Sequence, residues 1–211
     1  MKSAFGAIVE TIILAAVIFF LVRSAVQTFR VEGRSMEPTL YTGQRLLINK
    51  AAYWSFDASV VLRYLPGQSG GTNEPNRISP FGAPKRGDVI VFRYPLDPNR
   101  DFIKRVIGEP GDTVAIKEGT VYLNGQAIHE PYVKAVPRYD LAEQTVPPNQ
   151  YFVLGDNRNS SSDSHVWGMV PRENIIGQAL LCYWPPQQWG FLASTAPLAA
   201  QDVELGEEDQ E

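Results

Sequence analysis

The chain opens with one long apolar run and continues as many short alternations of apolar and polar residues. The apolar run covers residues 4–22, and its only charged residue is Glu10. As a helix, at about 1.5 Å per residue, it spans roughly 28 Å, which is close to the hydrocarbon core of a bilayer at about 30 Å. We therefore expect a transmembrane anchor over residues 4–22.

Two other interpretations of this run remain open. A cleaved signal peptide also begins with a cation such as Lys2 and an apolar stretch, but Glu10 lies inside the run, Arg23 closes it and no A-x-A motif follows directly. A buried core helix has a similar composition. Taken alone, the positive-inside rule puts the C-terminal side in the cytoplasm, because Arg23, Arg30 and Arg34 follow the run.

Beyond Val31 the chain turns to short β-prone runs separated by Gly, Pro and Asn. This punctuation is typical of a mainly β domain, a sandwich or a barrel, which we expect over residues 23–191. Asn124-Gly125, directly after one such run, predicts a two-residue hairpin turn. The expected strands are Arg45–Asn49, Asp88–Tyr94, Phe102–Ile107, Thr113–Ile116, Thr120–Leu123, Tyr151–Leu154 and Ile175–Tyr183.

Two segments depart from the β pattern. Residues 63–86 hold eight Gly or Pro among 24 positions, which predicts a loop insertion. Residues 192–211 begin with small residues and end with six carboxylates and no Lys or Arg, so we expect a flexible acidic tail. Without those six charges the formal net charge of −4 becomes +2 for the rest of the chain.

Composition narrows the protein class. The chain is 44% hydrophobic and 20% charged, which argues against a wholly disordered chain, and its net charge of −4 argues against a general nucleic-acid binder. The single cysteine, Cys182, excludes an internal disulfide framework, and with only His129 and His165 it leaves too few ligands for a typical structural zinc site. Because Cys182 lies in an apolar run, we interpret it as a buried structural residue rather than a nucleophile.

Ser35 lies in a segment rich in turn-forming residues, between Gly33 and Pro38. Such a turn can expose a nucleophile and leave its backbone N–H free to bind an oxyanion. A serine in this setting is more often only a turn residue. In addition, Glu37 stands where a G-x-S-x-G elbow needs its second glycine.

Lys104 shares one face of an expected strand with Phe102 and Val106, since side chains alternate with period two. If that face points inward, burial lowers the pKa of the lysine, and a neutral lysine can act as a general base. The alternative is that Lys104 snorkels or faces solvent while Arg105 points inward.

A long polar loop follows the strand that ends at Leu154. Its hydroxyl, amide and carboxylate groups suit either a hydrogen-bonding platform or a flexible loop, and the closing Trp167-Gly168 favours an ordered one. Asp163 and His165 are two positions apart, so on an extended strand they would share a face, as a Ser-His-Asp triad requires. We favour His165 as a structural partner of a carboxylate.

Four motifs occur in a fixed order after the apolar run: G-x-S-M-x-P-T-L at 33–40, G-D-V-x-V-F at 87–92, K-R-V-x-G-x-P-G-D at 104–112 and G-D-N-R-x-x-S-x-D-S-x-x-W-G at 155–168. Together they resemble bacterial type I signal peptidases, which are membrane-anchored serine endopeptidases with a Ser/Lys dyad. The resemblance runs from about Ala4 to Trp189 and implies a signal-peptidase-like β-sheet or barrel catalytic domain after one transmembrane helix.

The resemblance also implies roles for individual residues. Ser35 would be the nucleophile, with Met36 the methionine that follows it, and Lys104 would be the general base. Ser161 would supply the hydroxyl that orients the lysine, and Asp163 would be the acidic residue two positions later.

Further positions of the same motifs would support the dyad. Arg105 and Asp156 would pair as ions near it, and Gly155 and Asn157 would shape the site. Gly33 stands where some family members have a serine whose hydroxyl helps to bind the oxyanion. That side-chain donor is missing here, so the oxyanion would depend on the N–H of the nucleophile and a second donor not identified from the sequence.

His165 is a second departure, because some members have an arginine at this position, two residues after the acidic one. An imidazole changes charge within the physiological pH range and a guanidinium does not. We therefore expect the stability of this loop to be more sensitive to pH than it would be with an arginine.

The function implied by the resemblance is that of signal peptidase I, which removes N-terminal signal peptides from exported preproteins after small residues at −1 and −3. The implied location is the bacterial cytoplasmic membrane, crossed once, with residues 1–3 in the cytoplasm and the catalytic domain on the outer face. This opposes the charge count, but the substrates emerge on the outer face. Exported preproteins and the lipid bilayer are the implied partners, and we expect no nucleic acid, metal or cofactor.

Two alternatives and one open question remain. A soluble self-cleaving protease of the repressor type shares the Ser/Lys chemistry, but residues 4–22 argue against it. A membrane-tethered β domain without enzymatic activity, which mediates interactions, would share the fold. The sequence leaves the oligomeric state open.

Overall fold

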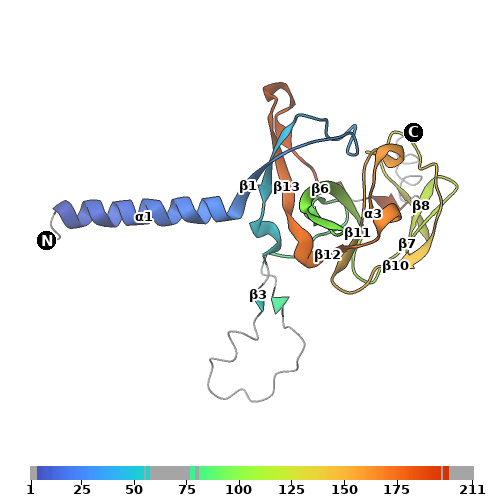
Figure 1. Ribbon diagram of the computed structural model, residues 1–211, viewed down its shortest axis with the longest axis horizontal. Coiled ribbons are helices and arrows are strands. Elements are labelled where there is room, and N and C mark those ends of the chain that lie inside the picture. Colours follow the sequence, from blue (N-terminus) through green and yellow to red (C-terminus); the bar gives the residue numbers. More distant parts are fainter. Residues whose placement is uncertain (1–3, 55, 58–76, 79–80, 196, 200–211) are drawn as a thin grey trace, which may run out of the picture.

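The computed structural model describes residues 4–54, 56–57, 77–78, 81–195 and 197–199. Its first element, the helix α1, covers Ala4–Ala25 and extends three residues past the run expected as the anchor. Figure 1 shows α1 projecting away from the β domain, and none of the apolar span Gly6–Ala25 is buried. The interpretation as a buried core helix is therefore wrong. The length and composition of α1 are sufficient to cross a membrane.

The described residues form a main sheet of eight antiparallel strands in the order β1-β2-β13-β5-β6-β11-β12, with β14 paired to β13. The bounds are Val26–Arg30 for β1, Arg45–Asn49 for β2, Val89–Tyr94 for β5, Asp97–Gly108 for β6, Gln150–Leu154 for β11, Val170–Pro171 for β12, Ile175–Trp184 for β13 and Gly190–Phe191 for β14. Strand β6 is paired on both edges, by β5 and β11, which fixes its position in the domain.

A second sheet has the order β10-β7-β8-β9-β15, and β3 pairs with β4 as a separate two-stranded ladder. In Figure 1, β7, β8 and β10 lie at the end of the molecule opposite α1. The strand bounds are Phe56–Asp57 (β3), Arg77–Ile78 (β4), Thr113–Lys117 (β7), Thr120–Leu123 (β8), Gln126–His129 (β9), Leu141–Thr145 (β10) and Leu198–Ala199 (β15). Short helices cover Ala51–Tyr53 (η1), Arg158–Ser160 (η2), Ser164–Trp167 (α3), Arg172–Asn174 (η3) and Pro186–Gln188 (η4).

The prediction of a mainly β fold is confirmed, and each expected strand is present as β2, β5, β6, β7, β8, β11 or β13. The largest difference is in β6, which begins at Asp97 instead of Phe102. The expected hairpin joins β8 and β9. Both turn residues have positive φ, 51° at Asn124 and 79° at Gly125, as this two-residue turn requires.

In two segments, described residues form strands that the sequence did not predict. Within the expected insertion 63–86, the described positions include β4, which pairs with β3. Positions 63–76 and 79–80 lie outside the described residues. Within the expected flexible tail, Leu198–Ala199 form β15 and pair with β9, and Leu192 packs against the core. Residues 196 and 200–211 of that tail lie outside the described residues.

Strand β6 runs between three hydrophobic clusters, and this position determines how far its polar side chains are buried. Ile103 belongs to the cluster that includes Met36, Val106 to a second cluster and Ile107 to a third. Over residues 103–108 both faces of the strand are therefore buried, whereas residues 98–101 are exposed. A lysine or arginine on either face leaves water and needs a partner.

Candidate active site

Ser35 lies in a turn between β1 and β2 that several contacts hold in place. Gly33 has a φ of +83°, in the region that favours glycine. Met36, directly after the serine, is buried in the core, and its carbonyl accepts the N–H of Leu40 at 2.8 Å. The hydroxyl of Thr42 donates to the carbonyl of Gly33 at 2.7 Å. These contacts fix the position of a half-buried serine.

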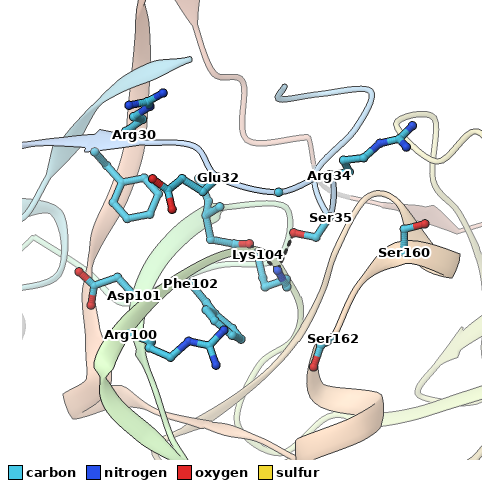
Figure 2. Close-up of a pocket in the computed structure, with 13 residues that line it drawn as sticks. Arg30, Glu32, Arg34, Ser35, Arg100, Asp101, Phe102, Lys104, Ser160 and Ser162 are labelled. Carbon is cyan, nitrogen blue, oxygen red and sulfur yellow. Dashed lines mark hydrogen bonds between the residues drawn. The ribbon is translucent and has the colours of Figure 1, made fainter. Parts of the chain in front are cut away.

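Lys104 reaches from β6 to Ser35, and its Nζ lies 2.7 Å from Ser35 Oγ (Figure 2). Its exposed fraction is 4%, so the interpretation in which it faces solvent is wrong. Burial lowers the pKa of Lys104 to about 8, although the charges of Asp163 and Asp156 act in the opposite direction. A lysine with such a pKa has a substantial neutral fraction near pH 8, and only the neutral form of a lysine can accept a proton.

Arg105 forms the expected pair with Asp156. Its Nε lies 2.9 Å from Oδ1 and its Nη2 2.7 Å from Oδ2, and neither side chain is more than 2% exposed. Arg105 Nη1 also donates to the carbonyl of Gly87, and Thr39 Oγ1 donates to Asp156 Oδ2 at 2.5 Å. The pair therefore ties β6 both to the polar loop after β11 and to the turn that contains Ser35.

Asn157 of the polar loop also binds the backbone of the turn that contains Ser35. The N–H of Asn157 donates to the carbonyl of Ser35 at 3.0 Å, and its side-chain amide donates to the carbonyl of Arg34 at 3.1 Å. A Cβ at Gly155 would lie 2.5 Å from the carbonyl oxygen of Ser35 and 2.3 Å from Ser161 Oγ. Because real Cβ atoms do not approach so closely, this position accepts only glycine.

Ser161 lies against Gly155, and its Oγ is buried. Within the described part of the chain this hydroxyl makes no hydrogen bond. The bond to Lys104 that the resemblance implies is therefore not present in this structure.

Asp163 is itself part of the polar loop, is completely buried and contacts two other residues of that loop. Its Oδ2 accepts the N–H of Gly155 at 2.9 Å, and its Oδ1 lies 2.5 Å from Nδ1 of His165. The hydroxyl of Ser35 is hydrogen-bonded to Lys104 and not to this imidazole. The contacts therefore favour His165 as the partner of a carboxylate over the triad interpretation.

A second buried ion pair, which the sequence did not indicate, lies next to the first. Arg158 Nη2 lies 2.6 Å from Glu130 Oε1, and its Nε donates to the carbonyl of Gly155. Glu130 also accepts the hydroxyl of Tyr132, whose ring lies under Arg105 with the guanidinium carbon 3.9 Å from the ring centroid. Arg158 falls inside a matched motif, but Glu130 and Tyr132 do not, so only the fold brings them together.

A cavity of about 560 Å³ opens over the Ser35–Lys104 pair. Figure 2 shows the charged residues Arg30, Glu32, Arg100 and Asp101 on one side of the pair, and Arg34, Ser160 and Ser162 on the other. The residues that line it are Phe29, Arg30, Glu32, Gly33, Arg34, Ser35, Arg100, Asp101, Phe102, Ile103, Lys104, Ser160 and Ser162. This volume falls within the usual range of ligand pockets, roughly 300–1,000 Å³.

Cys182 does not line this cavity, and it is buried with 3% exposure and its Sγ 3.4 Å from the carbonyl of Trp184. This agrees with the interpretation as a structural residue. Among the residues that the structure describes, no three His, Cys, Asp or Glu side chains are grouped as a metal ion would require.

Comparison with known proteins agrees with these motifs. The family model for signal peptidase, peptidase S26, matches residues 5–184. Signal peptidase I of Leptolyngbya laminosa is 38% identical, with 87% of this chain and 82% of that protein covered. Probable signal peptidase I-1 of Synechocystis sp. is 37% identical, with 92% and 90% covered. A crystal structure of a signal peptidase I from Enterococcus faecalis is 33% identical and covers 46% of this chain and 97% of its own, with a TM-score of 0.42. The chain therefore belongs to the signal peptidase family, peptidase S26.

Proposed function

We propose that this chain is a membrane-anchored signal peptidase I, a serine endopeptidase that removes N-terminal signal peptides from exported preproteins. The observation that carries the proposal is the 2.7 Å contact between the buried Lys104, whose pKa is lowered to about 8, and the hydroxyl of Ser35. The relatives in Synechocystis sp. and Leptolyngbya laminosa are themselves named signal peptidases, which supports the substrate class.

In the proposed acylation step, neutral Lys104 accepts the proton of Ser35 as Oγ attacks the scissile carbonyl. Within the described residues the backbone N–H of Ser35 donates to no protein acceptor, which leaves it available for the oxyanion. Protonated Lys104 then gives its proton to the leaving amine, and the acyl group remains on Ser35 as an ester. In deacylation Lys104 accepts a proton from water as the water oxygen attacks the ester. The bond between the acyl carbon and Ser35 Oγ then breaks, Lys104 returns the proton to Oγ, and the signal peptide leaves as a carboxylate.

The cavity suits an extended peptide with small side chains. An extended chain can add as a strand to exposed backbone, with alternate side chains entering shallow pockets. Phe29, Phe102 and Ile103 provide apolar surface in the cavity next to Ser35. We propose that this surface receives the small residues at −1 and −3 of the preprotein.

We further propose that α1 anchors the chain in the bacterial cytoplasmic membrane, with residues 1–3 in the cytoplasm and the catalytic domain, residues 23–191, on the outer face. Preproteins emerge on that face, so this orientation brings the enzyme to its substrates. Arg23 at the outer end can extend its side chain to the interface. Confinement of enzyme and substrate to one membrane raises their effective concentration.

The deciding experiment compares cleavage of a preprotein by the purified full chain with that of Ser35→Ala, Lys104→Ala and the double variant. Each single change should abolish cleavage while the circular-dichroism spectrum stays that of the wild type. The double change should cost little more, because the two residues act as a unit. If Lys104→Ala keeps more than about a tenth of the wild-type rate, worth only ~1.4 kcal/mol, the general-base assignment is wrong. If the wild type cleaves nothing, the non-enzymatic alternative is favoured instead.

A further inference from the structure

His165 is held between an aromatic ring and a buried carboxylate. Its Nδ1 lies 2.5 Å from Asp163 Oδ1, and its ring stacks on Tyr139 with the centroids 3.8 Å apart and the planes 11° from parallel. The side chain of His165 is 16% exposed and that of Asp163 is fully buried. The imidazole is therefore fixed in orientation, with the carboxylate as its charged neighbour.

Asp163 connects this imidazole to the candidate site. Its second oxygen, Oδ2, accepts the N–H of Gly155 at 2.9 Å. Gly155 in turn packs directly against the carbonyl of Ser35 and the hydroxyl of Ser161. A change in the position of the Asp163 carboxylate would thus be transmitted to both serines.

Charge provides a second connection, from Asp163 to Lys104. The carboxylate favours the ammonium form of the lysine and so raises its pKa, against the larger lowering by burial. A positive charge at position 165 would offset the carboxylate and remove part of that stabilisation. Tyr139 is the titratable group stacked on the imidazole, and the charges that act on Tyr139 are those of Asp163, Arg158 and Glu130.

We propose that His165 is a positioning residue that acts on Lys104 through Asp163. The Nδ1 atom of His165 holds the Asp163 carboxylate in place, and the charge at position 165 sets how strongly that carboxylate favours protonated Lys104. This inference rests on the proposed role of Lys104 as general base.

The test compares His165→Arg with His165→Gln in preprotein cleavage by the full chain, with kcat/KM measured on both sides of the Lys104 pKa. Arginine keeps a planar group for Tyr139 and adds a permanent charge, whereas glutamine can donate to Asp163 without one. The acidic limb of the profile of kcat/KM against pH should have its midpoint at a lower pH in the arginine variant than in the glutamine variant. The expected difference is roughly 0.5–1 pH unit for a unit charge in a partly buried site. Coincident limbs would overturn the proposal.

Two controls exclude other causes of a shift. Val166→Arg adds the same charge on the adjacent, 64% exposed side chain and should leave the limb where it is. An equal shift in that variant would mean that net charge and not Asp163 is responsible, which overturns the proposal. If the arginine variant does not fold, as judged by its melting temperature, His165→Lys supplies the charge instead. A purely structural role would lower kcat/KM equally at every pH, and that result counts against the proposal.

Failure of this inference is distinguishable from failure of the proposed function. Retained cleavage by Lys104→Ala would overturn the base assignment itself. Loss of cleavage in that variant, together with coincident limbs for the two His165 variants, would overturn only the role of His165.

Discussion

Lys104 Nζ lies 2.7 Å from Ser35 Oγ, although the two residues are 69 positions apart in the chain. The contact exists because β6 is enclosed by core clusters on both faces while the serine turn is fastened above it by Met36 and Asn157. Burial of the lysine is thus a consequence of where β6 lies. The same burial gives the ammonium group its lowered pKa.

Cleavage should depend on pH in the direction set by this lysine. The general base must be neutral, and burial lowers the pKa of Lys104 to about 8. As pH falls below that value the lysine becomes protonated, so kcat/KM should fall about tenfold per pH unit and level off above it. Initial rates of preprotein cleavage at a subsaturating substrate concentration measure this. A rate that is flat from neutral pH upward would exclude Lys104 as the titrating base.

Asp156→Ala should reduce activity and melting temperature together. Removal of this carboxylate leaves Arg105 buried without its charge partner, and such a loss costs about 3–5 kcal/mol when both side chains are as buried as these. Glu143→Ala, which removes an exposed carboxylate on β10, should leave both quantities nearly unchanged. Thermal unfolding and preprotein cleavage are measured on the same samples. A variant of normal stability that has lost its activity would instead make Asp156 a catalytic residue.

Gly155→Ala should impair catalysis because the new methyl group meets the carbonyl oxygen of Ser35 and the hydroxyl of Ser161 at 2.5 and 2.3 Å. Overpacking of this kind costs about 1–3 kcal/mol, and here the backbone of the serine turn must move to relieve it. Gly190→Ala is the matched control, since a Cβ there meets nothing within 4 Å and its φ is not in the left-handed region. The measurement compares the rate of cleavage and the melting temperature of the two variants. Equal activity of the two would show that the turn tolerates displacement.

Alkylation of Cys182 should leave activity unchanged. The thiol is 3% exposed and does not line the cavity over Ser35. A buried cysteine reacts slowly with alkylating reagents and takes no part in the proposed chemistry. The folded protein is treated with iodoacetamide, the modification is quantified by mass spectrometry, and cleavage is then assayed. Rapid inactivation in step with modification of this thiol would contradict the structural interpretation.

Much of the fold was predictable because its signals are local. The apolar run that became α1, the strand runs and the Asn124-Gly125 turn depend on composition, period two and the φ preference of a few residues. The spacing of the motifs also pointed to Ser35 and Lys104, and the pair Arg105–Asp156 was expected from them. In each case the residues that carry the signal are close in sequence or belong to a recognisable pattern.

Tertiary structure decided what depends on contacts between distant segments. The sequence posed a choice between Lys104 and Arg105 as the inward residue, but both are buried, because sheets and clusters enclose β6 on both faces. Glu130 meets Arg158 across 28 positions, and Leu198–Ala199 add a strand to β9, with no local pattern that marks either contact. Periodicity fixes which residues share a face of a strand. Only the packing of the other strands determines whether that face meets water, a carboxylate or the hydroxyl of Ser35.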